Sequence, residues 1–494
     1  MELKDIAGAV QKYLQRANRN TAYIPYTTVM QECYAWYRNA TDWHSYFVFS
    51  GLRKVWCERA KLGMAKMGCE DWASLLLNEN VKITASGELE NNQIKNVLSD
   101  NNFAVEANRL VEIMFALGTG AFVETWNGEK VVIDYIHGDM VFPLTWDNGK
   151  ITECAFAKIG GELDKSEFTV ILHTLEDVNG QKQYVIKTVE LDAEGGVCRP
   201  TRPIQVAYGL KTIEEENNEF TSILYTDSDV PLFQIIKPNI VNNYDKTNPL
   251  GMGIIYNAID ILKSIDLEYD SLQNEFMLGK KRIFVKSGLK SIKQVDKNAK
   301  NKAIVNHIDP NDTMFYTLNT DSDDGKLPIQ VYDPTLRTNE HNVALNTQLT
   351  LLSRAFGLGD GFYEFSSGKI ARTATEIVSI NSSLFRNLCK HELIISDAIK
   401  GLCKAILNLY NRYGGTAYDI NSEVTIDYDD SIIDDTEKRQ QKAMAEFNAG
   451  LIDQVEYFVL SRNMTREQAK KFVAEMQSTD TLKEVSSIMN NYGF

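Results

Sequence analysis

The stretch GLGDGFYEFSSGKIARTATE, residues 357–376, joins two parts of the chain that differ in pattern. Three glycines fall within its first five positions: Gly357, Gly359 and Gly361. Glycine adopts positive φ angles without a steric cost, so we predict a mobile loop here and not a helical turn. Residues 373–376 have the form of a capping box, in which a threonine hydroxyl and a glutamate satisfy free amides at a helix start.

A long helix is predicted to follow the capping box. Apolar residues recur at helical spacing as far as Tyr410, and Gly414 and Gly415 end the pattern. About forty residues make a rod of roughly 60 Å at 1.5 Å per residue. Asn381 and Gly401 are positions at which the rod could bend. A rod of this length favours a larger assembly over a compact enzyme.

The composition limits the class of protein. The chain has 494 residues, 44% of them hydrophobic, enough for about two to four domains. The formal net charge of −15 argues against a general nucleic-acid coat, although it permits a channel through which DNA slides. No apolar run approaches membrane-spanning length, and the first residues do not form a signal peptide. Seven cysteines without a CxxC pair indicate reduced thiols in a cytosolic protein.

Hydrophobic periodicity predicts an α+β fold. Helices are expected at residues 2–18, 50–78, 103–117, 251–279, 339–356 and 373–414, at 435–448, and from 465 onward. Strands are expected at 81–84, 120–126, 129–136, 150–158, 167–174, 182–191, 204–209 and 424–428. Asn-Gly pairs at 127–128, 148–149 and 179–180 predict tight hairpin turns. Three prolines mark a linker: Pro231, Pro238 and Pro249.

No motif for catalysis, metal binding or cofactor binding is recognised. Lys369 follows a glycine but lacks the spacing of a phosphate-binding loop, and His391 has no second histidine four residues on. No GxSxG sequence occurs. Two acidic groups are interpreted as a solvated turn and a helix entry, with metal ligation as the open alternative. They are Asp321, Asp323 and Asp324, and then Asp427, Asp429, Asp430, Asp434 and Asp435.

A basic segment interrupts this acidic chain between residues 280 and 302. Within this segment the only acidic residue is Asp296. Two interpretations stay open: a solvated face, or a contact with a partner or with DNA. The basic residues are Lys280, Lys281, Arg282, Lys286, Lys290, Lys293, Lys297, Lys300 and Lys302.

Three stretches together carry a resemblance to a known family. NPLG at residues 248–251 opens a helix that leads to GKKRIF at 279–284, and TATEI at 373–377 opens the long helix. VTIDYDDS at 424–431 is followed by GLI at 450–452, and WASLL at 72–76 lies near the front. In this order the stretches resemble the portal proteins of tailed bacteriophages, of the long-tailed siphovirus type.

The resemblance implies a division of the chain into the regions of the portal fold. The wing takes residues 1–250 and the first stem helix 251–279. The clip takes 280–336 and the second stem helix 337–356. A tunnel loop at 357–372 precedes the long helix at 373–414, the wing returns over 415–455, and the crown takes 456–494.

The resemblance also implies a role without catalysis. A ring, usually a dodecamer, stands at one capsid vertex and passes double-stranded DNA inward during packaging and outward at ejection. The clip faces the terminase large subunit and later the head–tail adaptor, and the wing faces major capsid and scaffolding proteins. The expected locations are the virion and, during assembly, the host cytoplasm. No membrane is involved.

Individual residues receive roles from this reading. The three glycines of 357–361 and the cations Lys369 and Arg372 are expected to line the channel as the tunnel loop, the cations making transient phosphate contacts. Lys280, Lys281, Arg282, Lys286, Lys290 and Lys293 are expected to bind partners of the clip. Aromatic residues at 362, 363 and 365 are expected to wedge neighbouring loops together. The alternatives are a DNA-packaging enzyme, such as a nuclease or ATPase, and a helical scaffold or adaptor unrelated to DNA.

Overall fold

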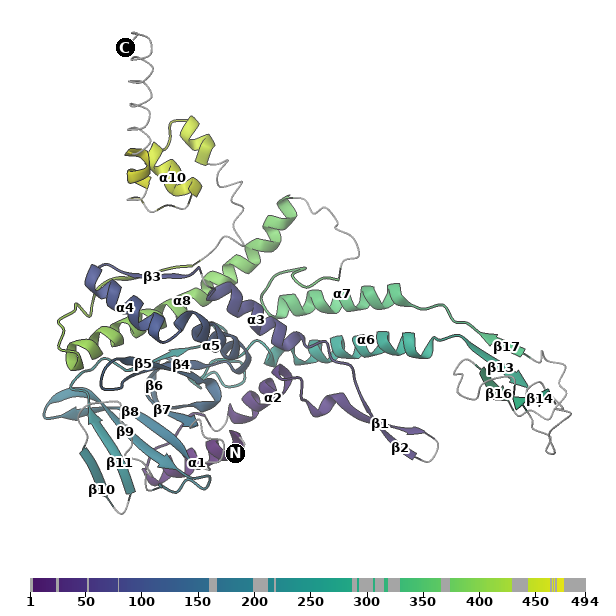
Figure 1. Ribbon diagram of the computed structural model, residues 1–494, viewed down its shortest axis with the longest axis horizontal. Helices are drawn as coiled ribbons and strands as arrows, with labels where there is room; N and C mark the ends of the chain where they lie inside the picture. Colours follow the sequence, from purple (N-terminus) through teal and green to yellow (C-terminus); the bar gives the residue numbers. More distant parts are fainter. Residues whose placement is uncertain are drawn as a thin grey trace, which may run out of the picture.

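The computed structural model describes residues 3–23, 26–50, 53–78, 80–159, 167–198, 212–216, 219–286, 291–292, 305–306, 315–318, 329–365, 374–428, 443–462, 464, 466 and 469–474. In this part of the chain, helices and mostly antiparallel strands build a body from which a two-helix stem projects, as Figure 1 shows. The predicted α+β class is confirmed.

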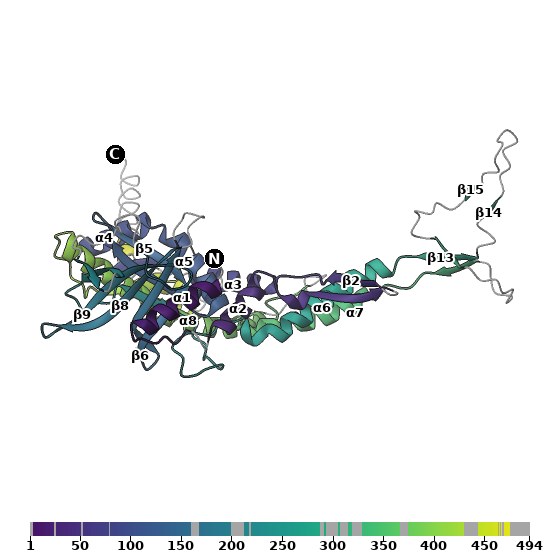
Figure 2. The same ribbon diagram turned by 90° about the horizontal axis from the view of Figure 1, so that it is seen from below.

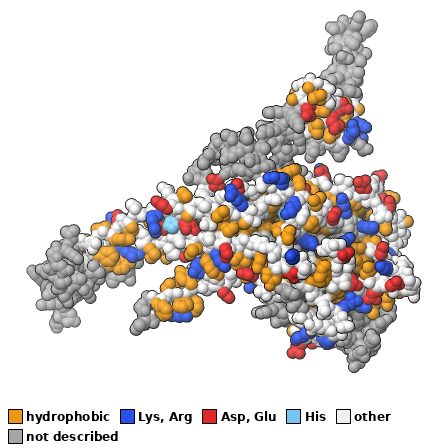
Figure 3. Space-filling view, turned by 180° about the vertical axis from the view of Figure 1, so that it is seen from behind, with side chains coloured by type: hydrophobic (Ala, Val, Ile, Leu, Met, Phe, Trp, Pro, Cys, Tyr) orange, Lys and Arg blue, Asp and Glu red, His pale blue; other side chains and the backbone are white. Residues whose placement is uncertain are grey.

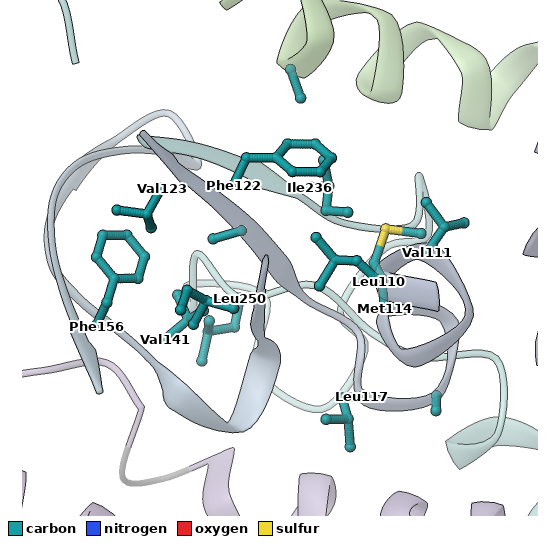
Figure 4. Packing of buried hydrophobic residues seen from close by; sticks show 14 of the residues in the cluster. Leu110, Val111, Met114, Leu117, Phe122, Val123, Val141, Phe156, Ile236 and Leu250 are labelled. Carbon is teal, nitrogen blue, oxygen red and sulfur yellow. The ribbon is translucent and has the colours of Figure 1, made fainter. Parts of the chain in front are cut away.

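The centre of the body is helix α5 (Phe103–Leu117) and a three-stranded sheet in the order β12-β4-β5. Its strands are β12 (Phe233–Ile236), β4 (Gly120–Trp126) and β5 (Val131–His137). Figure 4 shows Leu110 and Met114 of α5 beside Phe122 of β4 and Ile236 of β12, all of them buried. Helix α5 ends at Gly118 with a φ of 87°, a left-handed conformation that glycine favours after a helix.

The long helix α8 (Ala374–Tyr413) has 40 residues and packs on β12 and β4. Its predicted length is confirmed, and it ends before Gly414 and Gly415 as expected. At Gly401 an added Cβ would lie 2.1 Å from Oε1 of Gln234. Gly401 therefore lets the helix approach β12 closely, which is a packing role. The capping residue Thr373 lies outside the described residues.

A six-stranded antiparallel sheet covers one side of the body in the order β10-β11-β9-β8-β7-β6. At two of the predicted Asn-Gly turns both residues have positive φ, namely Asn148–Gly149 and Asn179–Gly180. This pair of conformations matches the right-handed twist of the flanking strands. The strands are β6 (Val141–Asp147), β7 (Lys150–Ile159), β8 (Phe168–Val178), β9 (Gln181–Leu191), β10 (Thr212–Glu216) and β11 (Glu219–Tyr225).

Segments from the two ends of the chain complete the body. Strand β3 (Lys82–Ala85) pairs with β18 (Val424–Asp427), and Ser86 Oγ lies 2.9 Å from Ser422 Oγ. The N-terminal helices pack on the same continuous core. They are α1 (Leu3–Arg16), α2 (Thr27–Tyr37), α3 (Met64–Leu76) and α4 (Glu88–Asp100). Completing the body therefore requires contacts between residues more than 300 positions apart.

The stem consists of α6 (Ile259–Leu278) and α7 (Thr338–Ala355), which pack side by side. Figure 2 shows the stem leading away from the body to strand β13 at its far end. There β13 (Arg282–Lys286) lies between β16 (Phe315–Leu318) and β17 (Ile329–Tyr332), and β14 (Ser291–Ile292) pairs with β15 (Val305–Asn306). A separate small cluster around Phe458 includes helix α10 (Gln454–Arg462).

Three sequence expectations are wrong. Residues 50–78 do not form one helix, because β1 (Ser45–Ser50) and β2 (Arg53–Glu58) form a hairpin before α3. The run YFVF with VW in the return strand favours extended backbone, since aromatic and β-branched side chains suit a pleated sheet. The proline-marked linker contains β12, and residues 251–255 precede the stem helix as irregular backbone. The strand expected at 204–209 and most of the helix expected at 435–448 lie outside the described residues.

Candidate functional site: the stem and its two ends

The two stem helices are joined by charged side chains near the clip end. Arg337 donates from its backbone N and from Nε to Oε1 of Glu275, at 3.1 and 3.2 Å, and from Nη2 to Oε2 at 2.8 Å. Hydrogen bonding by Arg337 lowers the pKa of the Glu275 carboxyl to about 2. One turn closer to the body, Nδ1 of His341 lies 2.6 Å from Oε1 of Glu268. The pairs fix the register of α7 against α6.

A buried polar network holds the opposite side of α6 to the body. Nε2 of His44 lies 2.8 Å from Oδ2 of Asp266, and both side chains are almost completely buried. The other oxygen of Asp266 accepts a hydrogen bond from the amide of Leu62 at 2.9 Å. On the next turn, Asp270 accepts a hydrogen bond from the amide of Ala60 at 3.0 Å. Sequence analysis missed this network because 222 positions separate His44 from Asp266, and neither lies in a motif.

The turn after α7 is anchored to the body. Nε1 of Trp72 donates to the carbonyl of Phe356 at 2.8 Å, and Nδ2 of Asn387 donates to the carbonyl of Gly357 at 2.7 Å. Phe356 and Leu358 are buried. The three predicted glycines do adopt positive φ, at 79°, 86° and 72°. They do so in a packed turn, however, and not in the mobile loop that the sequence led us to expect at Gly357.

The chain remains anchored as far as Phe365. The amide of Tyr363 donates to Oγ of Ser353 at 3.1 Å, and its hydroxyl donates to Asp71. Burial first, and then this carboxylate, raise the pKa of Tyr363 far above its usual range. Phe365 exchanges two hydrogen bonds with the side-chain amide of Asn346, at 2.7 and 3.0 Å. The described part of the predicted tunnel loop is therefore bound to the body and to α7, and Lys369 and Arg372 lie outside the described residues.

The aromatic run 362–365 divides into two environments. Tyr363 packs within its own chain, whereas Phe362 and Phe365 are 39% and 53% exposed. Of the three aromatic residues, Phe362 and Phe365 are therefore the ones that the chain leaves exposed.

The clip end presents part of the predicted basic group. Lys280 is exposed, Lys281 pairs with Asp333 at 3.3 Å, and the guanidinium of Arg282 lies over the ring of Tyr316. Lys286 belongs to β13, but its side chain is outside the description, as are Lys290 and Lys293. Asp333 offsets part of the positive charge, which leaves Lys280 as the described cation most open to a partner.

His391 and His173 are core groups of the body. The ring of His391 accepts a hydrogen bond from the amide of Asn239 at 3.0 Å and packs edge-on against Trp72 and Phe115. Burial lowers the pKa of His391 to about 4 and that of His173 to about 3. Both rings are therefore neutral near pH 7.

The described residues contain no cluster of His, Cys, Asp or Glu arranged to hold a metal ion. Of the two acidic groups singled out from the sequence, only Asp427 falls in the described part, in β18. None of the seven cysteines forms a disulfide bond. Among the helices that the structure describes, none combines the length and hydropathy needed to cross a bilayer.

Comparisons with known proteins point to one family. The model of the family described as "Phage portal protein, SPP1 Gp6-like" matches residues 28–481. Two chains of solved structures are similar, one from "Virion of native gene transfer agent (GTA) particle" and one from "Neck of native GTA particle computed with C12 symmetry". Each match is 10% identical, covers 87% of this chain and 92% of the other, and has a TM-score of 0.43. No curated protein sequence matches.

The family model spans nearly the whole chain, including the body, the stem and the turn that joins α7 to α8. The chain therefore belongs to the SPP1 Gp6-like family of phage portal proteins.

Proposed function

We propose that copies of this chain close into a ring, with twelve as the number implied by the resemblance, and that its axial channel passes double-stranded DNA. The portal role at the capsid vertex follows from membership of the family, whose model covers residues 28–481. This match is the single observation that carries the proposal. A portal protein is a structural component of the virion. Assembly takes place in the host cytoplasm, in contact with major capsid and scaffolding proteins.

The shape of the chain supports a ring built from unlike surfaces. A stem and a hairpin project from the body and carry exposed apolar side chains, among them Phe49, Trp56, Phe276 and Val343. In a ring, each copy presents one surface to one neighbour and a different surface to the other. Such head-to-tail contacts bury apolar projections without needing a second kind of protein.

Native mass spectrometry and electron microscopy of the purified protein test the ring. We expect a closed particle with a central hole and a mass that is an integer multiple of 55.9 kDa, twelve-fold in the simplest case. A chain that stays monomeric at high concentration and under assembly salt contradicts the proposal. A ring with associated nuclease or ATPase activity would favour the alternative of a packaging enzyme.

The clip is proposed to dock the terminase large subunit first and the head–tail adaptor later. Changing Lys280, Lys281 and Arg282 to Glu should weaken binding of these partners at low salt and leave ring formation intact, because charges at an exposed rim act mainly on encounter. A control with the same change in charge replaces Lys95, Lys150 and Lys182 on the body by Glu. Equal binding by both variants means that the basic group is only a solvated face.

The tunnel loop is proposed to lie beyond Phe365 and to include Lys369 and Arg372. A lysine is a point charge on a flexible stem, so it can contact a phosphate briefly while DNA moves. Replacing both cations by Ala should reduce packaged DNA length or its retention in rings that assemble normally. Normal DNA handling by this variant would contradict the loop's role, and failure of ring formation would instead assign the segment to a subunit interface.

A further inference from the structure

The β1–β2 hairpin is exposed on both faces although its side chains are those of a protein interior. Its larger apolar residues are well exposed: Phe47 by 44%, Val48 by 44%, Phe49 by 70%, Val55 by 43% and Trp56 by 67%. Phe47 packs edge-on against Phe49 and Trp56, and Lys54 lies 3.7 Å above the ring of Phe47. An isolated two-stranded hairpin is marginal in water, so this one needs a surface to cover it. Figure 3 shows the hydrophobic patch below the stem, on the projecting hairpin.

The base of the hairpin is rigid, which fixes where its tip can reach. His44 precedes β1 and is bound to Asp266 of α6, while Ala60 and Leu62 follow β2 and donate to Asp270 and Asp266. The guanidinium of Arg59 stacks on the rings of Trp43 and Tyr46, 4.4 Å from each. Both ends of the hairpin are thus tied to the same helix. These contacts fix the direction in which the hairpin and its exposed aromatic face project from α6.

A matching apolar stripe runs along α6. Ile265, Tyr269, Leu272 and Phe276 recur at spacings of four, three and four, so they share one face of the helix. Ile265 is buried in the body, Tyr269 and Leu272 are half-buried, and Phe276 is 50% exposed. The stripe therefore loses its cover as the helix leaves the body. The hairpin of the same chain is tied to the neighbouring face of this helix, through Asp266 and Asp270.

Charge complements this pairing of surfaces. Helix α6 carries five acidic side chains and one lysine: Asp260, Asp266, Glu268, Asp270, Glu275 and Lys263. Lys263 and Arg337 offset two of the acidic charges, and Asp266 is buried, so the helix keeps a smaller excess of negative charge. The return strand of the hairpin begins with Arg53 and Lys54, both exposed. An exposed aromatic hairpin with two cations and an acidic helix whose apolar stripe ends in the exposed Phe276 therefore occur on one chain. Repetition of the chain around a ring brings unlike surfaces of this kind together.

We propose that the β1–β2 hairpin of one copy lies on α6 of the next copy, with Phe47, Phe49 and Trp56 covering the stripe from Tyr269 to Phe276. This inference rests on the proposed ring and specifies a contact that holds it closed. Each copy gives its hairpin to one neighbour and receives a hairpin from the other. In a closed ring every hairpin is covered by a neighbouring copy, so no hairpin is left exposed in the complete particle.

Site-specific photo-crosslinking tests the contact. Trp56 is replaced by p-benzoylphenylalanine, and rings are assembled from an equal mixture of ¹⁴N and ¹⁵N chains before irradiation. We expect adducts between chains of different label, mapped by mass spectrometry to residues 267–278. Adducts confined to one chain, adducts at other surfaces, or intact rings without an adduct overturn the inference while the ring stands. Wild-type protein that forms no ring overturns the proposed function as well.

Substitution measures the strength of the contact. Phe49→Ser together with Trp56→Ser should raise the concentration for half-assembly by at least about tenfold, because aromatic anchors dominate such contacts. Phe276→Ser, on the receiving surface, should act in the same direction. Leu89→Ser is the matched control, since Leu89 is 71% exposed on α4 and lies outside both surfaces. Equal assembly by all three variants overturns the inference.

Discussion

The body and the projecting parts of this chain use the same kinds of side chain in opposite ways. In the body, Trp72 is fully buried, stacks on Phe115 with ring centroids 5.3 Å apart, and donates to the carbonyl of Phe356. In the hairpin, Trp56 is 67% exposed and contacts Phe47 and Lys54 of the same hairpin. The aromatic side chains of the body are covered by the chain itself, whereas those of the hairpin are left exposed, as expected if other copies cover them.

The two tryptophans give the strongest test of this difference. Trp72→Ala should reduce the free energy of unfolding of the isolated chain by about 3–5 kcal/mol, because it opens a cavity and leaves a buried carbonyl without its donor. Trp56→Ala should change it by no more than about 0.5 kcal/mol, as for an exposed side chain. Urea unfolding of unassembled protein measures both. Similar losses for the two variants would mean that the hairpin is part of the folded body after all.

Two helical glycines sharpen the same comparison within the body. At Gly68 of α3 an added Cβ would lie 2.3 Å from the buried ring of Phe356, so Gly68→Ala should cost about 1–3 kcal/mol of stability. At Gly8 of α1 an added Cβ meets nothing within 4 Å. Gly8→Ala should therefore stabilise the chain by about 0.5–1 kcal/mol through helix propensity. Thermal unfolding shows both signs, and a neutral Gly68→Ala would mean that the joint between α3 and α7 is loosely packed.

Acid should weaken the body before it separates the stem helices. Burial lowers the pKa of His173 to about 3, so the folded protein binds its proton less readily than the unfolded chain, whose histidine titrates near 6.5. Stability from this group is full above about pH 6.5 and falls by about 1.4 kcal/mol per pH unit below it, down to the folded pKa. His173→Phe should remove the contribution of this group and leave that of His391, and a phenylalanine ring can keep the packing on Phe156 and Phe233. Urea midpoints at pH 7 and pH 5 measure it, and an unchanged slope contradicts the prediction.

The smallest effect is expected in the stem. Removing Arg337 frees a carboxylate that is held by exposed hydrogen bonds, so Arg337→Ala should leave the unfolding of the body unchanged. The change should instead speed amide exchange at the clip end of α6 and α7. In the wild type, Arg337 lowers the pKa of Glu275 to about 2. The contribution of this pair to stability is therefore full above the pKa of an unfolded glutamate and is lost as the pH falls toward 2. A loss of body stability in this variant would show that stem and body unfold together.

Local patterns predicted the elements whose side chains need only near neighbours. Apolar spacing gave α8 its 40 residues, and Asn-Gly gave the β6–β7 and β8–β9 turns. The β1–β2 hairpin was mistaken for helix because Leu52, Val55 and Trp56 happen to match helical spacing. Spacing identifies a helix or a strand through the side chains that are buried on one face. In this hairpin the apolar side chains are exposed on both faces, so their spacing does not distinguish a helix from a strand.

The site was predicted less well because its geometry depends on distant partners. The glycines of 357–361 correctly indicated positive φ, yet Asn387, Trp72 and Asn346 fix the segment in place. The basic segment was visible in the sequence, but its neutralisation at Lys281 depends on Asp333, which arrives through the folding of β13 against β17. The tunnel-loop and clip roles themselves stay predictions.

The pairing of β3 with β18 has a consequence for the order in which the protein is made. Ser86 and Ser422, which meet at the end of this pair, are separated by 336 positions. At a synthesis rate of about 5–20 residues per second, roughly 20–70 s pass between the emergence of the two strands from the ribosome. During that interval β3 is an open edge, and both stem helices are made before β18 emerges. A chain that is still being made therefore has both stem helices before its β3–β18 pair can form. Correct assembly is expected to favour chains that have already been released from the ribosome.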